Sequence, residues 1–311
     1  LAAKRLFPRA EPYKTVLLLC AIITAPLFWC FWKLYAHPPI FVWDHLWGYF
    51  SGSIYDEGIQ VDSRLLLFRG VTLSRIFVLI FALSLWETRN ATILKKAVIP
   101  FLLLITLWGI ENSWGARWGF VIQRSDILAE LSQTVEIPGM VIHLPPSLNK
   151  SKVETVVEDH QFNLDYMLGA LDLPPESVLN NPIHSFVYSD ANHKGRWMGG
   201  KNTMVAKPWL NEIHIHGTGF PHKVLPHELV HALAGQFGSR LLGVSAQYEL
   251  GVNLALVEGL AEALTPPTTD VDLDHYAKAM RTLKLAPDLR TLLSPTGFWQ
   301  QSPRRAYTIA G

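Results

Sequence analysis

Cysteine and charge are both scarce in this chain of 311 residues. There are only two cysteines, and 17% of the residues are charged, against about a quarter in typical soluble domains. Cys20 and Cys30 lie in one apolar run, where ten helical residues would separate them by about 15 Å, which is too far for a disulfide. Two cysteines also cannot build a zinc site based on thiolates, so any metal has to be held by His, Asp and Glu.

A net charge is almost absent as well. The 27 basic residues exceed the 26 acidic ones by one, which excludes a generic nucleic-acid binder with a basic face or tail. The hydrophobic share of 49% excludes intrinsic disorder. The length suits roughly two domains.

The first apolar run carries no charge from Thr15 to Trp32, which is long enough to cross a bilayer core of about 30 Å. A signal peptide is the alternative, since basic residues precede the run: Lys4, Arg5, Arg9 and Lys14. The run is too long and too aromatic for that reading, and no small-residue cleavage site follows it. We therefore expect a retained membrane anchor.

Two shorter apolar runs follow, Ile76–Trp86 and Ala97–Ile110. Each is short for a membrane span, so buried core helices are the alternative. Tryptophans flank the runs as in interfacial belts, and a basic turn with Arg89, Lys95 and Lys96 separates them. The sequence thus predicts a membrane region over 1–115 with three segments (about 15–36, 70–86 and 95–111), either spanning or partly re-entrant, then a linker over 116–138.

Residues 139–311 have the pattern of a globular α+β domain. A capping box, Ser151 with Glu154, opens a predicted helix that ends before Pro174. Short strands are expected at 140–144, 184–188, 204–206 and 211–216, with a Gly-rich basic stretch at 194–201. Helices dominate from Pro221 onward.

His227-Glu228-Leu229-Val230-His231 forms an HExxH pattern. On a helix, positions i and i+4 share a face, so both imidazoles can reach one metal ion, while Glu228 can act on a water bound to it. Core histidines with structural hydrogen bonds are the alternative. The surrounding segment, ending at Gly238 as the expected helix stop, is otherwise apolar or small, and burying these groups there is costly unless they are paired or bind a metal.

A catalytic zinc needs a third protein ligand. The segment Val252–Leu264 is apolar except for Asn253, Glu258 and Glu262. The two carboxylates are spaced i and i+4, without the polar neighbours that a solvated helix face would have. We expect Glu258 to be the third ligand and Glu262 to accept a hydrogen bond from a ligand histidine.

HELVH followed by EGLAE resembles the gluzincin metallopeptidases, and above all the peptidase MA-like domains often attached to bacterial membranes. The resemblance covers about Met140 to Gly311. It implies one zinc ion bound by His227, His231 and Glu258, with Glu228 as the general base. The interval from His231 to Glu258 is longer than in thermolysin, and residues 1–115 carry no such resemblance.

In this family, a Tyr or His from a helix after the glutamate helix stabilises the oxyanion. Tyr307 occupies the matching place, with His275 and Tyr276 as alternatives, and a plain packing role for Tyr307 stays open. His214 and His216 alternate onto one face of a strand. The resemblance implies that this strand lines the substrate cleft, so the two histidines are expected either on the cleft wall or at the exposed surface.

The sequence therefore predicts a membrane-anchored zinc metallopeptidase that hydrolyses a peptide or protein substrate, with the lipid bilayer as a further partner, no nucleic acid and an undetermined oligomeric state. The positive-inside rule predicts a periplasmic catalytic domain on a bacterial inner membrane. The competing interpretation is a non-catalytic zinc-binding domain of a membrane transporter or assembly component. Glu228 argues against it, because a structural zinc does not need that carboxylate. An intramembrane peptidase is disfavoured by the polar flank Pro221-His222-Lys223.

Overall fold

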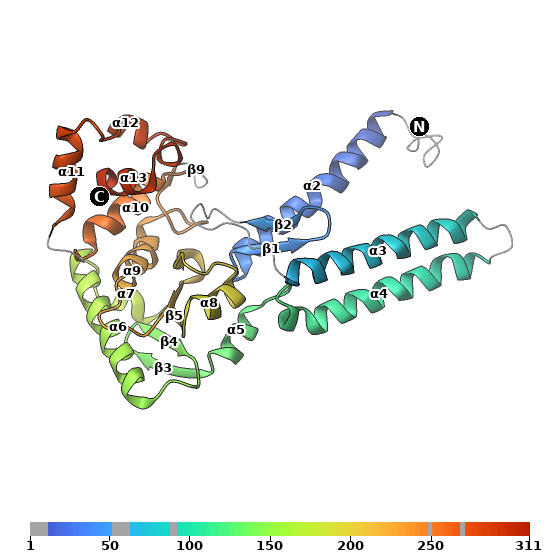
Figure 1. The fold of residues 1–311 in the computed structure, drawn as a ribbon, viewed down its shortest axis with the longest axis horizontal. Coiled ribbons are helices and arrows are strands. Elements are labelled where there is room, and N and C mark those ends of the chain that lie inside the picture. Colours follow the sequence, from blue (N-terminus) through green and yellow to red (C-terminus); the bar gives the residue numbers. More distant parts are fainter. Residues whose placement is uncertain (1–11, 52–62, 88–91, 248–250, 268–270) are drawn as a thin grey trace. The chain divides into compact units, whose positions relative to one another are not determined.

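The computed structural model describes residues 12–51, 63–87, 92–247, 251–267 and 271–311 (Figure 1). Contacts divide the chain into two compact units. The first comprises residues up to Ile127 together with Arg196–Gly199, and the second comprises Leu128–Gly195 and Gly200–Gly311. Several basic residues on which the predicted topology depends lie outside the described residues: Lys4, Arg5, Arg9 and Arg89.

The first unit combines long helices with a small β-hairpin. Its elements are α2 (Pro12–Ala36), β1 (Phe41–Asp44), β2 (Gly48–Ser51), α3 (Ser63–Glu87) and α4 (Ile93–Trp118). α3 and α4 pack side by side along their length (Figure 1). β1 and β2 pair antiparallel, and Trp43 of β1 stacks near Phe68 of α3 and Phe120.

Two helices in the described part of the chain are long and apolar enough to cross a membrane, Ser63–Leu85 and Val98–Trp118. Both are longer than the apolar runs predicted, because flanking polar residues continue the helices. Only 6% and 11% of these segments is buried, which argues against soluble core helices. The prediction of three such segments was wrong by this measure: α2 is helical over 15–36, but several of its side chains are not described and it is not one of the two.

The second unit is built on a mixed five-stranded sheet. Its strands are β3 (Gln133–Ile137), β4 (Met140–Leu144), β5 (Ile183–Tyr188), β6 (Val205–Lys207) and β7 (Glu212–His216), in the order β3-β4-β5-β7-β6. The pairs β4–β5 and β5–β7 are parallel, whereas β3 and β6 are antiparallel edge strands. The predicted mixed α and β character is confirmed.

The two faces of this sheet differ in chemistry because side chains alternate along each strand. One face carries Ile142, Val187 and Ile213, which form the main hydrophobic core with α6 (Lys150–Ala170) and α9 (Leu225–Ala234). The opposite face carries a row of stacked rings, His143, Phe186 and His214, with centroids 4.7 and 4.6 Å apart. Buried polar partners surround this row, so we call it the polar face.

The remaining described elements after α4 are mostly short, and α5 and α8 each extend from one unit into the other. They are α5 (Arg124–Glu130), α7 (Glu176–Leu179), α8 (Ala191–Met198), β8 (Ala246–Gln247), β9 (Gly251–Val252), α10 (Leu254–Leu264), α11 (Leu273–Thr282), α12 (Leu289–Leu292) and α13 (Pro303–Ala310). The segment 116–138 contains α5 and the edge strand β3, where a linker was predicted. The N-cap of α6 is Asn149, whose side chain accepts from the Lys152 amide, so the capping box assigned to Ser151 was wrong.

Candidate metal centre

The HExxH helix α9 begins at Leu225, so Pro226 lies in its first turn, where a missing N–H costs nothing. The side chain of the N-cap residue Val224 makes no capping hydrogen bond. Instead, His222 Nδ1 accepts from the Leu225 amide at 3.0 Å, while His222 Nε2 donates to the His216 carbonyl at 3.1 Å. The α-helix ends at Ala234 and a 3₁₀ turn continues it to Phe237, so the helical segment ends at Gly238, where the sequence predicted its stop.

The apolar face of α9 fixes the direction of its histidines. Leu225, Leu229 and Leu233 are fully buried in the core with the sheet and α6. Because positions three and four apart share a helix face, His227 and His231 project together from another side, where both are half-buried. α10 packs against α9, and the Asn253 side chain caps α10 by accepting from the Leu256 amide.

Three ligand atoms converge between α9 and α10. His227 Nε2 and His231 Nε2 are 3.1 Å apart, and Glu258 Oε2 lies 3.4 and 3.6 Å from them. The side chains of His227, His231 and Glu258 are 15, 11 and 14% exposed. A search of the described residues for three or more His, Cys, Asp or Glu side chains that could hold one metal ion gives this group. The sequence had predicted the same three residues.

These distances fit a tetrahedral zinc site. Zinc bonds to histidine nitrogen and carboxylate oxygen are about 2.0–2.2 Å, so the edges of a tetrahedron around the ion are about 3.3–3.5 Å. The three observed separations of 3.1, 3.4 and 3.6 Å bracket that value. Three protein ligands also leave the fourth position open, as in catalytic rather than structural zinc sites.

Two further carboxylates, Glu262 and Glu228, lie beside the group of His227, His231 and Glu258. Glu262 Oε1 lies 3.5 Å from His227 Nδ1, the ring nitrogen that faces away from Glu258, so it can orient the imidazole. Glu228 is buried, 5% exposed. Burial raises the pKa of Glu228, although the charges of His231 and His227 oppose the shift. A raised pKa suits a carboxylate that takes up and returns a proton.

The surroundings of Glu258 favour its ionised form. Burial alone would raise its pKa, but hydrogen bonds from His227 and His231 outweigh this effect and lower the pKa of Glu258 to about 2. For His227, burial acts to lower the pKa, and the hydrogen bond that His227 donates to Glu258, together with the charges of the neighbouring carboxylates, raises the pKa overall. The surrounding carboxylates therefore favour a positive charge at this point, either a proton on His227 or a metal ion that takes its place.

Tyr307 of α13 lies beside this cluster. Its ring centroid is 6.5 Å from that of His227 and 5.4 Å from that of Phe298. The close approach of α13 to α10 depends on Gly259, because a Cβ there would lie 2.4 Å from the Ala310 carbonyl oxygen. The glycine of the EGLAE segment therefore lets α13 bring Tyr307 to the site. His275 is exposed at the start of α11 and pairs with Asp272, and Tyr276 is 38% exposed.

The expectation for His214 was wrong. Strand alternation places it on the polar face of the sheet, opposite to the face that packs against α9. It is fully buried, with Nδ1 3.2 Å from the Tyr188 hydroxyl and Nε2 3.4 Å from Glu212. Its side chain is thus neither on a cleft wall nor at the surface. His216 is half-buried on the same side of the strand.

Two residues that position the HExxH helix were not identified as such from the sequence. His222 caps α9, and Asp159 of α6 accepts from the His222 amide at 2.9 Å. Only the proximity of His222 to the motif could have drawn attention to it.

Comparisons with family models, curated proteins and solved structures find no match for this chain.

Proposed function

We propose that this protein is a zinc-dependent metallopeptidase attached to a membrane. The observation that carries the proposal is the set of separations between His227, His231 and Glu258, which match the edges of a tetrahedral zinc site. The buried carboxylate of Glu228 beside this set supports hydrolysis over a structural role. His227, His231 and Glu258 would hold the ion, which when bound polarises the scissile carbonyl and lowers the pKa of water.

Three residues near the proposed ligands have separate roles in the proposed reaction. Glu228 accepts a proton from the attacking water and returns it to the leaving amine, so peptide hydrolysis proceeds without a covalent intermediate on the protein. Glu262 holds His227 in orientation. The Tyr307 hydroxyl is the candidate donor to the oxyanion. The resemblance of HELVH and EGLAE to gluzincin peptidases agrees with these roles.

The same proposal places the second unit outside the cytoplasm. This placement rests on the sequence alone: the basic N-terminus stays inside, the charge-free run Thr15–Trp32 crosses the membrane, and the α3–α4 pair then leaves the chain on the far side whether it spans or re-enters. Protease added to sealed right-side-out vesicles should digest the second unit, and complete protection before lysis would contradict this topology.

Glu228→Gln tests the catalytic role most directly. The variant should bind one zinc per chain, as the unaltered protein does, and lose about 10²–10⁴-fold of its turnover of a peptide library, because only proton transfer is removed. Glu158→Gln, at an exposed carboxylate of α6, is the matched control. Normal peptidase activity in Glu228→Gln would refute the mechanism. Absence of zinc from the unaltered protein would refute the metal site.

A further inference from the structure

A cavity of about 510 Å³ lies in the first unit, far in sequence from the HExxH helix. Its volume falls within the range of about 300–1,000 Å³ that small-molecule sites occupy. Its walls come from the end of α2, the β1–β2 hairpin, α3, α4 and the segment Arg196–Gly199. Nothing in the proposed peptidase chemistry uses this cavity.

The cavity lies at the ends of the apolar runs of the α3–α4 pair. Arg75 directly precedes the run Ile76–Trp86, and Glu111 directly follows the run Ala97–Ile110; both line the cavity. Two tryptophans in the lining, Trp29 and Trp108, are 54 and 61% exposed. Arg75 and Glu111 lie inside the longer candidates Ser63–Leu85 and Val98–Trp118, but they mark the points where the charge-free stretches of these helices begin and end. Charged residues and exposed tryptophans that adjoin an apolar stretch are typical of the level of lipid headgroups.

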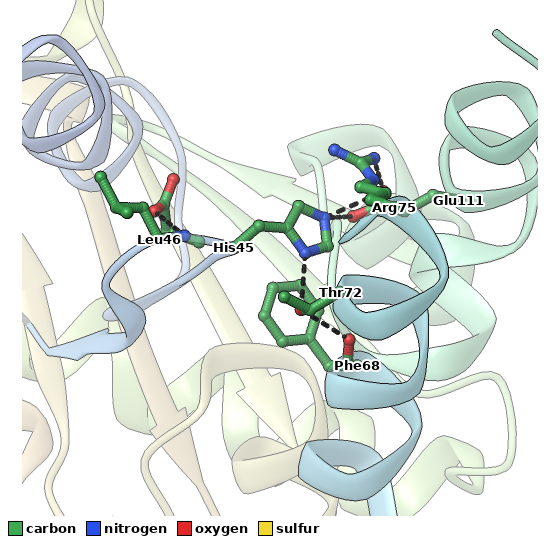
Figure 2. A network of polar contacts seen from close by, with 7 residues as sticks. His45, Leu46, Phe68, Thr72, Arg75 and Glu111 are labelled. Atoms are coloured by element: carbon green, nitrogen blue, oxygen red, sulfur yellow. Dashed lines mark hydrogen bonds and ion pairs between the residues drawn. The ribbon is translucent and has the colours of Figure 1, made fainter. Parts of the chain in front are cut away.

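A polar network lies in one wall of the cavity, with Thr72 and Glu111 buried and His45 and Arg75 partly exposed (Figure 2). His45, in the turn after β1, lies with Nδ1 2.8 Å from the Thr72 hydroxyl and Nε2 3.1 Å from Glu111. Arg75 also pairs with Glu111. The network joins the β1–β2 turn to α3 and α4, and it compensates the charge of Glu111.

The charge of the lining favours an anionic ligand. Four basic side chains line the cavity (Lys33, Arg64, Arg75 and Arg196), against two carboxylates. Asp44 already accepts from the amides of Leu46 and Trp47, both at 2.9 Å, and Glu111 is held in the network. The charged group of Lys33 lies 5.5 Å from the Trp29 ring, and that of Arg196 lies 5.8 Å from the Trp197 ring.

We infer that this cavity binds the phosphate-bearing headgroup of an anionic membrane lipid. Lys33, Arg64 and Arg196 supply the positive charge for the phosphate, and the exposed rings of Trp29 and Trp108 flank the acyl chains. A lipid rather than a soluble phosphate compound is favoured because the same cavity joins cations to interfacial tryptophans beside two membrane-crossing candidates. The inference does not depend on the metal site.

The test uses the full chain in neutral detergent micelles, titrated with phosphatidylglycerol and read by native mass spectrometry. Phosphatidylcholine and millimolar inorganic phosphate form the comparison arms. Lys33→Gln/Arg196→Gln should weaken phosphatidylglycerol binding about 25-fold, at roughly fivefold for each basic residue. Arg69→Gln/Arg117→Gln is the matched control, since both residues are exposed and neither lines the cavity; Arg117 lies over Trp114 much as Lys33 lies over Trp29.

One saturable phosphatidylglycerol site that is lost only in the cavity variant supports the inference. Equal weakening in both double variants would overturn it, because the attraction would then be diffuse. Equal affinity for phosphatidylcholine would overturn it too, since no anion would be selected. Displacement by inorganic phosphate at the concentration of the lipid would reassign the cavity to a soluble phosphate. If the double variant does not fold, the exposed Arg196→Gln alone should still weaken binding about fivefold.

Discussion

Gly259→Ala examines whether the glutamate helix and α13 really meet at the distance on which the Tyr307 assignment depends. The new Cβ would lie 2.4 Å from the Ala310 carbonyl oxygen and 2.7 Å from its carbon. Ordinary contact would require α13 to retreat by roughly 1 Å. Since both obstructing atoms belong to the backbone, no side-chain rotation can relieve the clash.

The expected cost follows from that displacement. Overpacking of this kind costs about 1–3 kcal/mol, which lowers the melting temperature of a unit of this size by about 3–10 °C. A shift of about 1 Å in Tyr307 should also lower peptide turnover by up to about 10²-fold. Tyr307→Phe alone should lower kcat by about 10²–10³-fold, and adding Gly259→Ala to it should cost no further turnover.

Gly169→Ala is the matched control, because it is also helical and a Cβ there meets nothing within 4 Å. That variant should gain up to about 1 kcal/mol from helix propensity. Differential scanning calorimetry and peptide turnover measure both effects. If Gly259→Ala is as stable as Gly169→Ala, the close contact of α10 and α13 does not exist. If its turnover falls equally with Tyr307 present or absent, Tyr307 is not the group displaced.

Two other predictions concern Glu262 and the polar face of the sheet. Glu262→Ala should weaken zinc affinity about 10–100-fold without unfolding the chain, as measured by competition with a chelator; unchanged affinity would mean that Glu262 does not orient His227. Burial lowers the pKa of Lys207 to about 7, against the opposing charge of Glu212, so above pH 7 the unfolded chain holds a proton that the folded chain has released. Stability should therefore rise with pH from 7 toward 10, by at most about 1.4 kcal/mol per pH unit. Urea unfolding should show this slope, and Lys207→Met should remove it; an unchanged slope in Lys207→Met would assign it to other groups.

The grouping of His227, His231 and Glu258 could be predicted from the sequence because helical spacing converts directly into geometry. Positions i and i+4 place His227 with His231, and Glu258 with Glu262, on shared helix faces. An otherwise apolar helix leaves such groups few other ways to be stabilised. The prediction that Glu258 of α10 meets the histidines of α9 needed one further assumption, namely that the apolar faces of the two helices are buried against each other.

The polar face of the sheet could not be predicted in the same way. Alternation places His214 and His216 on one side of β7, but it does not say whether that side is covered. Here Tyr188 and Glu212 accompany His214 into a buried layer. A strand buried on both faces lacks the clear polar and apolar alternation of a half-exposed one.

Weak or ambiguous local sequence signals explain the elements that were missed or misplaced. α8 was missed because Gly195 and Gly199 give the stretch 194–201 the composition of a loop. β3 was missed because its side chains alternate between half-buried and exposed at a sheet edge, which produces a weak signal. The capping box at Ser151 was misplaced by two residues, since Asn149 competes for the same role and is the preferred cap.

The two faces of the sheet should differ in their tolerance of random substitution. On the apolar face, a change that conserves volume costs little, because neighbouring aliphatic groups can repack. On the polar face several buried side chains are hydrogen-bonded to one another, so His214→Leu keeps the volume yet removes a ring nitrogen that contacts the Tyr188 hydroxyl and another that contacts the Glu212 carboxylate. A buried polar group that loses a hydrogen-bond partner carries a desolvation penalty. The polar face should therefore tolerate substitutions mainly when two interacting residues change together. On a single strand such as β7, residues facing the apolar side can then be replaced one at a time, whereas residues facing the polar side cannot.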